Sequence, residues 1–411
     1  MKRSSDQKFL TRKKYNYGRI PSNFLYSLAL KTILFFLKRI FNVHWDVDKN
    51  ISRLQGPIII LGNHPSNIDP ILLAGALYPI KINFLTASSY FHNSILRYLL
   101  YMIGTIPKTQ FRADPGAVKS MLKVIRRNGV LGIFPEGSRS IDGTTQSIED
   151  SITKLVKKTQ ANLVTGISSG AYLSWPRWTR SGIRRGRINI AVRIVLTGND
   201  IKSLEINTLN EIIKNAISYS DYKWQEKEHI VYKSKSPAAG VDSILHRCPS
   251  CNRNWINKSY GNVLECRHCG NKAIMDQYGF FHPENENSVV FETVHDWNAW
   301  QRESFLKDQK DVSIEAGARM YVFSDESSSM YSGRGKVSLN KDAISFNGVL
   351  LTTKVSKSFA LSGILGISAR YGRYFDLIED HYTYRFILKQ GQKAIGFAHA
   401  LEILREHKKV H

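Results

Sequence analysis

Two uninterrupted apolar runs, each followed at once by a polar turn, constrain the fold of this chain more than any other feature. Residues 57–61 are Pro-Ile-Ile-Ile-Leu and end at a glycine, and residues 130–134 are Val-Leu-Gly-Ile-Phe and end at a proline. Strands that are covered on both faces are apolar throughout, so we predict that both runs are buried strands. Each polar turn then lies at the carboxyl end of a strand.

The first turn carries two residues that can form a general base, His64 and Asp69. Ser66 can be the N-cap of a helix with Asp69 in its first turn. Residues five apart on a continuous helix point about 140° apart, so His64 and Asp69 can pair only if the histidine lies in the loop, which Pro65 favours. Such a carboxylate fixes the histidine tautomer and stabilises the imidazolium. The alternative is that Ser66 and Asp69 form only a capping box.

The second turn presents a carboxylate and a guanidinium. Pro135, Gly137 and Ser138 favour a tight turn that exposes Glu136 and Arg139. The planar fork of arginine makes paired, charge-assisted hydrogen bonds that suit phosphate. We therefore expect Arg139 to bind a phosphate group.

Together the two turns resemble the motifs of the glycerolipid acyltransferase family, whose lysophosphatidate acyltransferases carry H-x-x-x-x-D and F-P-E-G-[ST]-R blocks. His64 and Asp69 match the first block and residues 134–139 the second. The resemblance covers approximately residues 20–220. It implies that a fatty acyl group passes from acyl-CoA or acyl carrier protein to a glycerophosphate hydroxyl, with His64 as base, Asp69 as its orienter and no acyl-enzyme. It also implies an acceptor site shaped by Glu136, Gly137, Ser138 and Arg139.

Two other blocks of that family are altered in this chain. The family usually has an arginine a few residues after the glycine that corresponds to Gly104, whereas Gln110 falls near that place here. Lys108 and Arg112 are the nearest cations, and either can take the phosphate role. Thr165 stands where the family usually has a proline-containing block, so the sequence does not indicate which residues form the wall of the acyl pocket.

Charge and hydropathy near the amino terminus predict a membrane surface as partner. The chain has 58 Lys+Arg against 34 Asp+Glu, a net charge of +24, which suits an anionic membrane, nucleic acid or phosphorylated substrate. Residues 1–20 are expected to form a basic flexible arm. Residues 24–41 are strongly apolar but interrupted by Lys31 and Lys38, which favours a helix in the membrane interface. The alternative is an amphipathic helix packed on the domain.

Alternating strand and helix patterns predict an α/β domain over residues 21–222, which the resemblance implies is the acyltransferase domain. No secretory signal is visible, so we expect a peripheral protein at the cytoplasmic face of the cell membrane. Residues 223–243 are polar, contain Pro237 and are expected to form a linker. The expected strands are residues 82–87, 162–167 and 187–196, and the expected helices are residues 94–103, 117–127, 147–159 and 209–217.

Two C-x-x-C pairs predict a small metal-binding domain over residues 244–283. Cys248 and Cys251 are separated by fourteen residues from Cys266 and Cys269, and these are all the cysteines of the chain. The pattern resembles a zinc ribbon, with four thiolates around one structural Zn²⁺. Two disulfides are the alternative, which a reducing cytosol disfavours. Zinc ribbons often bind nucleic acid or protein, but we expect no nucleic-acid partner here.

Short alternating runs separated by turn residues predict a mainly-β domain over residues 290–411. Its strands and final helix resemble a pleckstrin-homology or GRAM-like domain, with a purely structural β domain as the alternative. The expected strands are residues 319–323, 335–339, 343–346, 361–368, 374–378 and 384–388, followed by a helix over residues 392–407.

These features together predict a membrane-associated enzyme that acylates a lysophospholipid, with 1-acyl-glycerol-3-phosphate as the favoured acceptor. The alternative is a non-catalytic regulatory protein that binds lipid or nucleic acid through a degenerate acyltransferase fold and a zinc ribbon.

Overall fold

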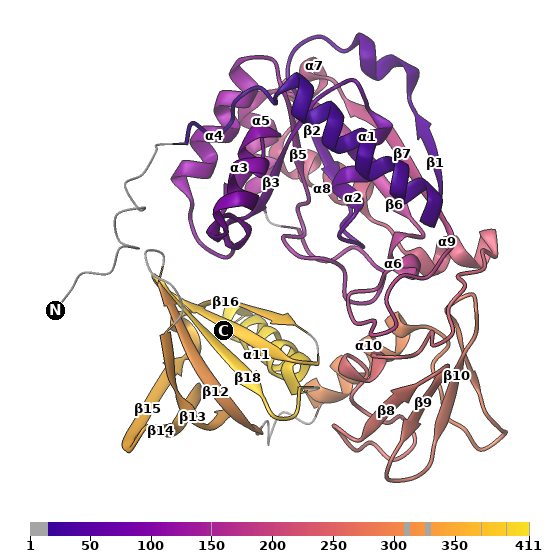
Figure 1. The fold of residues 1–411 in the computed structure, drawn as a ribbon, viewed down its shortest axis with the longest axis vertical. Helices are drawn as coiled ribbons and strands as arrows, with labels where there is room; N and C mark the ends of the chain where they lie inside the picture. Colours follow the sequence, from indigo (N-terminus) through magenta and orange to yellow (C-terminus); the bar gives the residue numbers. More distant parts are fainter. Residues whose placement is uncertain are drawn as a thin grey trace. The chain divides into compact units, whose positions relative to one another are not determined.

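The computed structural model describes residues 15–148, 150–307, 313–324, 330–370, 372–391 and 393–410. Residues 1–14 of the expected basic arm lie outside this part. The chain forms two compact units (Figure 1). The first unit comprises Met1–Ser138, Thr145–Ser169 and Asn189–Tyr219, and the second comprises Arg139–Thr144, Gly170–Ile188 and Ser220–His411. One crossing between the units falls between Ser138 and Arg139, inside the second predicted motif.

The first unit is built on a seven-stranded sheet in the order β1-β7-β6-β2-β5-β3-β4. β2 runs parallel to both β5 and β6, whereas β7 runs antiparallel to β6. Every residue of β2 and β5 is buried, which confirms the two predicted central strands. The strands are β1 (Asn42–Val47), β2 (Ile58–Gly62), β3 (Ile82–Ala87), β4 (Ile106–Lys108), β5 (Val130–Ile133), β6 (Asn162–Ser169) and β7 (Arg187–Leu196).

The helices of the first unit bury apolar stripes against this sheet. Leu131 and Leu163 of the sheet share one core with Val124 of α4, Val156 of α5 and Ile213 of α8. The helices are α1 (Asn23–Ile40), α2 (Asp69–Ala76), α3 (Ser94–Met102), α4 (Pro115–Arg126), α5 (Asp150–Thr159), α7 (Gly198–Ser203) and α8 (Ile206–Ile217), with the 3₁₀ helices η2 (Lys49–Arg53) and η3 (Ser88–His92).

The start of α2 differs from the expected one. We expected Ser66 to cap the helix, but the N-cap is Ile68, no side chain caps it, and the helix begins at Asp69. The Ser66 backbone N–H instead donates to Asp69 Oδ2 at 2.8 Å. The chain therefore stays in a loop through Ser66, because the aspartate binds that loop rather than the first turn of the helix.

The second unit contains a four-stranded antiparallel sheet in the order β11-β10-β9-β8. Its strands are β8 (Asn257–Tyr260), β9 (Val263–Cys266), β10 (Lys272–Met275) and β11 (Phe281–Pro283), and its helices before the terminal sheet are α6 (Ala171–Ser174), α9 (Asp221–Glu228), η4 (Val241–Ser243) and α10 (Val294–Lys307). Leu264 and Ala273 from this sheet share a core with Tyr172 and with Trp297 of α10.

Residues 223–243, which we expected to form a linker, instead contribute several buried residues to the core of the second unit. α9 continues to Glu228, and Tyr232, Ala238 and Val241 are fully buried in the same cluster as Trp297. The linker prediction was wrong because the few apolar residues of this polar segment are the ones that pack. Local composition does not reveal their partners, which come from distant strands.

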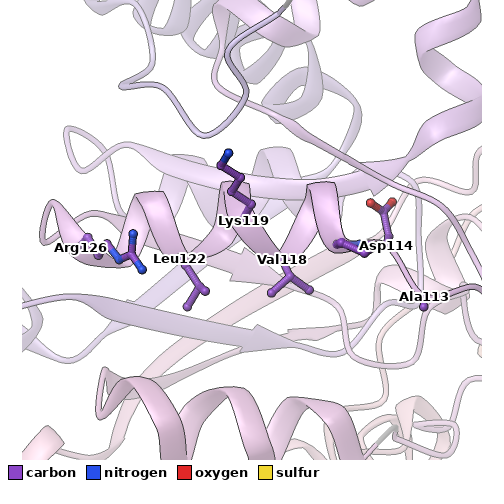
Figure 2. A pocket seen from close by; sticks show the side chains of 7 residues that line it. Ala113, Asp114, Val118, Lys119, Leu122 and Arg126 are labelled. Atoms are coloured by element: carbon purple, nitrogen blue, oxygen red, sulfur yellow. The ribbon is translucent and has the colours of Figure 1, made fainter.

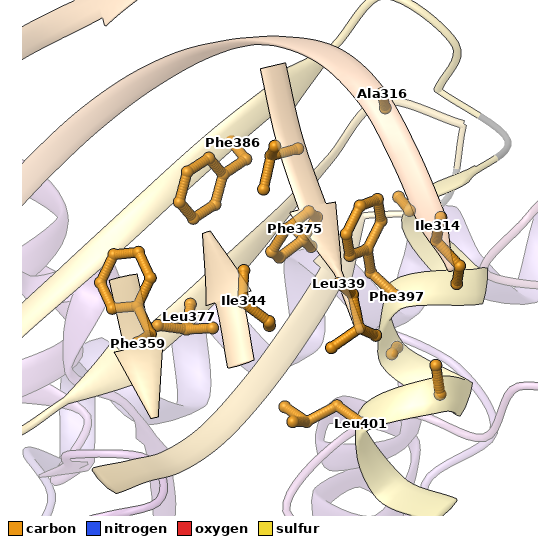
Figure 3. Close-up of a cluster of buried hydrophobic side chains, with 14 of the residues drawn as sticks. Ile314, Ala316, Leu339, Ile344, Phe359, Phe375, Leu377, Phe386, Phe397 and Leu401 are labelled. Carbon is orange, nitrogen blue, oxygen red and sulfur yellow. The ribbon is translucent and has the colours of Figure 1, made fainter. Parts of the chain in front are cut away.

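The carboxyl-terminal part of the second unit is mainly β, as predicted. Seven antiparallel strands in the order β15-β14-β13-β12-β18-β17-β16 are covered by α11 (Lys393–Val410). Phe375 stacks on Phe386 and on Phe397 of that helix, at centroid distances of 5.0 and 4.7 Å (Figure 3). The strands are β12 (Ile314–Ser324), β13 (Met330–Leu339), β14 (Ala343–Leu350), β15 (Thr353–Ala360), β16 (Ile364–Arg370), β17 (Tyr374–Glu379) and β18 (Tyr382–Leu388), with the 3₁₀ helix η6 (Leu361–Gly363).

β15 is the strand of this terminal sheet that the sequence did not predict. It lies at an edge and pairs only with β14, and Phe359 is its one buried residue. A strand with so little buried surface lacks the apolar alternation that sequence patterns detect. The resemblance to a pleckstrin-homology or GRAM-like domain stays a prediction.

Candidate active site

The parallel pairing of β2 and β5 brings the two predicted motifs to one edge of the sheet. Leu61 and Ile133 are paired in register, and each motif begins within three residues of its strand's last paired residue. In open parallel sheets the loops at the carboxyl ends of the strands form the usual binding crevice. The position agrees with the expectation from the sequence.

His64 and Asp69 form a close pair at this edge. His64 Nδ1 lies 2.9 Å from Asp69 Oδ2, and the same oxygen accepts the Ser66 N–H at 2.8 Å. Asp69 is fully buried, whereas 21% of the His64 side chain is exposed. With Nδ1 donating to the carboxylate, the other ring nitrogen, Nε2, is the proton acceptor. The loop conformation that the pairing requires is therefore present.

Phe134 holds the imidazole from one face. Its ring stacks on His64 with centroids 4.5 Å apart and an angle of 26° between the planes. Phe84 stacks in turn on Phe134, with centroids 5.9 Å apart. A Cβ at position 62 would lie 2.8 Å from a Phe134 ring carbon, so only glycine fits at Gly62. The histidine orientation is thus fixed by the Asp69 carboxylate and by an aromatic face.

Glu136 joins the two motifs through backbone groups. One carboxylate oxygen accepts the His64 N–H at 2.7 Å, and the other accepts the Gln146 N–H at 2.8 Å. We had grouped Glu136 with the acceptor-binding residues, which stays a prediction; its two bonds also hold the His64 backbone to the second motif. Nothing local in the sequence indicates this role, since His64 lies 72 positions before Glu136.

Asn63 is a second positioning residue that the sequence did not indicate. It is buried, its Nδ2 donates to the Ser168 carbonyl at 3.0 Å, and its Oδ1 accepts the Ser168 N–H at 2.8 Å. The side chain thereby continues the pairing between β2 and β6 into the loop. The one sequence signal for this role of Asn63 was that it directly precedes His64.

The turn after Phe134 is closed by its own backbone and by Gln110. The Gly137 N–H donates to the Phe134 carbonyl at 3.1 Å, and Gly137 has a φ of +66°, which favours glycine. Gln110 Nε2 donates to the Gly137 carbonyl at 2.8 Å. The residue near the place of the family's usual arginine therefore supports the turn directly, and Ser138 follows at its end.

The structure places the candidate cations in different surroundings. Lys108 Nζ donates within its own loop, to the carbonyls of Thr109 at 2.7 Å and Arg112 at 3.0 Å. Arg139 is the first residue of the second unit. The first unit therefore brings together His64, Asp69, Glu136 and Gly137, while Arg139 belongs to a loop that is held within the second unit.

The four cysteines gather into one cluster. Their sulfurs all lie within 4.8 Å of one another and can hold a metal ion. The Cys248–Cys269 and Cys251–Cys266 sulfur pairs are each 3.7 Å apart, and all four are free thiols rather than disulfides. Both C-x-x-C pairs are followed by a residue with positive φ, Asn252 at +58° and Gly270 at +75°. The repeated turn geometry aims all four sulfurs at one point.

One open groove lies apart from these residues (Figure 2). Its volume is about 430 Å³. It runs along α4, and no predicted site residue lines it. The lining residues are Ala113, Asp114, Pro115, Val118, Lys119, Leu122 and Arg126. Since one helix and the residues just before it form the whole lining, we assign it no role in the site.

α1 and α3 expose a large apolar surface in the first unit. α1 buries Tyr26, Leu30, Leu34 and Leu37, so it is packed on the domain, yet other apolar side chains of the same helix point outward. The Ser22 N–H donates to the Met102 carbonyl at 3.0 Å, so the start of α1 meets the end of α3. We call the exposed residues the α1–α3 face: Phe24, Leu28, Ile33, Phe35, Phe36, Ile95, Leu96, Tyr98 and Leu99.

No helix in the described part of the chain is both long enough and apolar enough to cross a bilayer.

Comparison with known proteins agrees with the geometry of the site. Residues 42–169, which contain both motifs, match the protein-family model Acyltransferase. This stretch resembles that family. The match ends with β6, and it does not include the cysteine cluster or the terminal β sheet.

Two curated relatives carry the same name, 1-acyl-sn-glycerol-3-phosphate acyltransferase. The Bacillus subtilis (strain 168) protein is 26% identical over 82 residues, which is 20% of this chain and 41% of the relative. The Borreliella burgdorferi protein is 28% identical over 111 residues, which is 26% of this chain and 43% of the relative. The chain thus spans less than half the length of these curated relatives.

One solved structure is similar to part of this chain. The crystal structure of the 1-acyl-sn-glycerophosphate (LPA) acyltransferase PlsC from Thermotoga maritima is 17% identical, and the similarity covers 54% of this chain and 86% of that chain with a TM-score of 0.40.

Glu136→Gln is expected to impair the acyl transfer proposed below without unfolding the protein. The amide keeps one acceptor oxygen and turns an NH₂ group toward a backbone N–H, so one charge-assisted hydrogen bond is lost and the His64 loop shifts. A bond of this kind contributes about 1.5–3 kcal/mol, so kcat should fall roughly ten- to a hundredfold. Steady-state kinetics and thermal unfolding measure the two quantities. Glu211→Gln on the exposed face of α8 is the control, and equal kcat in both variants would contradict the positioning role.

Proposed function

We propose that this protein transfers a fatty acyl group from acyl-CoA or acyl carrier protein to the free hydroxyl of a lysophospholipid, in phospholipid biosynthesis. The observation that carries the proposal is the His64–Asp69 pair, with Nδ1 and Oδ2 2.9 Å apart, in a domain that matches the acyltransferase family. A histidine oriented by a buried carboxylate is suited to deprotonating a hydroxyl group.

The proposed reaction is a direct transfer between two substrates. His64 Nε2 removes the hydroxyl proton while the hydroxyl oxygen attacks the thioester carbonyl carbon, which gives a tetrahedral oxyanion and an imidazolium. Asp69 stabilises that imidazolium through Nδ1. When the intermediate collapses, the carbon–sulfur bond breaks and the leaving thiolate takes the proton from the imidazolium. The products are an ester and a free thiol, and His64 is again neutral.

The favoured acceptor is 1-acyl-glycerol-3-phosphate. The names of both curated relatives support it, and Arg139 in the second motif supplies a guanidinium fork that matches a phosphate dianion. Gly137 and Ser138 are proposed to shape the same site through the turn that precedes Arg139. Lys108 and Arg112 remain further candidates for the phosphate, although Lys108 already donates to two carbonyls.

The cysteine cluster is proposed to hold one structural Zn²⁺. Four sulfurs about 2.3 Å from a central zinc ion stand about 3.8 Å apart at the corners of a tetrahedron, and the two sulfur pairs measured here are 3.7 Å apart. Four thiolates leave no open coordination position, so the metal would stabilise the fold rather than take part in the reaction. The ligands are Cys248, Cys251, Cys266 and Cys269.

The protein is proposed to bind the cytoplasmic face of the cell membrane peripherally through the α1–α3 face. A helix that lies in the interface needs an outward apolar surface with cationic groups beside it. Phe24, Phe35 and Phe36 are 72%, 54% and 58% exposed, and Lys31 and Arg39 belong to the same helix. This attachment would give the enzyme access to a lipid acceptor, and the excess of positive charge favours anionic lipids.

His64→Ala is expected to abolish acyl transfer while the fold survives. General base catalysis contributes roughly 10²–10⁴ in rate, and kcat should fall by this factor. The assay is acyl transfer from acyl-CoA to lysophosphatidate, with circular dichroism to confirm folding. His44→Ala, at an exposed position of β1, is the matched control. Near-normal turnover by folded His64→Ala would refute the catalytic assignment.

Arg139→Ala is expected to impair phosphorylated acceptors far more than neutral ones. A charge-assisted bond to phosphate contributes about 1.5–3 kcal/mol, so kcat/KM for lysophosphatidate should fall roughly ten- to a hundredfold. Arg139→Lys should retain part of that contribution because a point charge remains. The same measurement with a neutral monoacylglycerol provides the comparison, and an equal fall for both acceptors would remove Arg139 from the phosphate site.

Purified protein is expected to contain one zinc ion per chain. Since a ribbon of this size buries too little core to fold alone, chelation should expose it to proteolysis. Metal analysis and limited proteolysis test the two parts. The Cys266→Ser variant should lose the metal. The His268→Ala variant, which changes a residue between Cys266 and Cys269, should retain it. Metal-free protein or disulfide-bonded cysteines would exclude the site.

Phe35→Asp combined with Phe36→Asp is expected to weaken binding to anionic vesicles. Burying one large apolar side chain contributes about 1.5–3 kcal/mol, so the double variant should bind at least tenfold more weakly. Co-sedimentation with vesicles of phosphatidylglycerol and phosphatidylcholine measures this. Ile206→Asp replaces an exposed apolar residue outside the α1–α3 face and serves as control. Equal binding by both variants would exclude this face.

A further inference from the structure

A buried series of hydrogen bonds in the second unit connects the cysteine cluster to the loop that begins at Arg139. We call residues Arg139–Thr144 the acceptor loop. Asp142 anchors it: one carboxylate oxygen accepts from Asn298 Nδ2 at 3.0 Å and lies 3.2 Å from His295 Nδ1. Both partners belong to α10, which lies more than 150 positions later in the sequence.

The acceptor loop is also held rigid from within. Ser140 Oγ accepts the Gly143 N–H at 2.9 Å and donates to the Thr144 carbonyl at 2.7 Å. The other oxygen of Asp142 accepts from the Thr144 hydroxyl at 2.8 Å. A Cβ at Gly143 would lie 2.8 Å from the Tyr172 ring, so the backbone packs closely on that ring. A shift of Asp142 would therefore disturb residues 140–144, which follow Arg139 directly in the chain.

α10 is tied at its other side to the segment that leads into the cysteine cluster. Gln301 Nε2 donates to Asn298 Oδ1 at 3.0 Å and to the Ile244 carbonyl at 2.7 Å. Gln301 Oε1 accepts the backbone N–H groups of His246 at 3.1 Å and Arg247 at 3.4 Å. Arg247 directly precedes Cys248. The path from cluster to loop thus runs through Gln301, Asn298 and Asp142.

Burial makes this path sensitive to the loss of any member. Asp142, Asn298 and Gln301 are 5%, 7% and 0% exposed. A buried polar group that loses its partner costs about 1–3 kcal/mol, because no water replaces the bond. The three side chains are therefore confined to the one arrangement in which all of their bonds form.

Asp142 remains charged in this environment. Burial by itself raises the pKa of the carboxyl group, but hydrogen bonds from His295 and Asn298 outweigh burial and lower the pKa below its ordinary value. A carboxylate is a stronger acceptor than a neutral acid, so ionisation strengthens the anchor of the acceptor loop.

We propose that Gln301, Asn298 and Asp142 are positioning residues through which the fold of the cysteine cluster sets the place of Arg139. This inference rests on the proposed function, in which Arg139 binds the acceptor phosphate. Breaking the path should raise the KM for a phosphorylated acceptor. The His64–Asp69 pair and the KM for the acyl donor should be unaffected, since the path includes no residue of the first unit.

The test uses Asn298→Ala in the full-length protein. We expect the KM for lysophosphatidate to rise roughly two- to thirtyfold, the range found for substitutions along a physical network. The KM for acyl-CoA, the kcat and the zinc content should match the wild type. Hydrogen exchange should become faster at the Gly143 and Thr144 amides. Asp376→Asn is the control, because it removes the negative charge from a part-buried ion pair of Asp376 with Arg385, two bonds of 2.7 Å, elsewhere in the second unit.

A double variant tests whether the effect passes through Arg139. Adding Asn298→Ala to Arg139→Ala should not raise the KM further, because the affected contact is already absent. An additive rise would overturn the proposal, as would an unchanged KM and unchanged exchange in folded Asn298→Ala.

Chelation of the wild-type protein is a further test, and it does not depend on whether any variant folds. Removing the metal should speed exchange at Gly143 and Thr144 while amides of β18 stay protected. Unchanged exchange in the acceptor loop after complete metal removal would refute the connection to the cluster. If wild-type protein transferred no acyl group, the proposed function would fail, and the exchange measurements would still decide whether the path exists.

Discussion

The parallel pairing of β2 with β5 is the interaction on which the candidate active site depends. It places the two motif turns side by side, although about seventy residues separate them in the sequence. The Glu136 carboxylate then joins the turns through the His64 N–H. Without that pairing, His64 would still meet Asp69, but the imidazole would lose its stacking on Phe134, and the His64 backbone N–H would lose its bond to Glu136.

Carboxylates organise loops in both units in the same way. Asp69 accepts from His64 and Ser66, and Glu136 accepts from two backbone N–H groups. In the second unit, Asp221 accepts the N–H groups of Gly170 and Tyr172 at the start of α6. A charged acceptor makes stronger hydrogen bonds than a neutral one, so each acid can hold a loop that has no regular secondary structure. Asp142 does the same for the acceptor loop.

Local pattern was sufficient for elements that bury a regular face. The central strands, the helices on the first sheet and the mainly-β carboxyl-terminal region could all be predicted, since their apolar residues recur with the period of a strand or helix. Local sequence pattern failed to predict segments whose buried residues do not recur at regular spacing. Residues 223–243 looked like a linker because few of their residues are apolar, and β15 was missed because an edge strand buries almost nothing. The start of α2 was misplaced because Asp69 binds the loop.

The sequence by itself determined the chemistry available to this protein: a histidine and an aspartate five positions apart, an arginine after a tight turn, and four cysteines in two close pairs. Residues this near in the chain meet through local geometry, so their spacing is informative. Only the tertiary structure decided that Glu136 supports the histidine loop and that Asp142 connects the acceptor loop to α10. Those partners are 72 and 156 positions apart, and no local pattern encodes a contact that exists only when distant elements pack together.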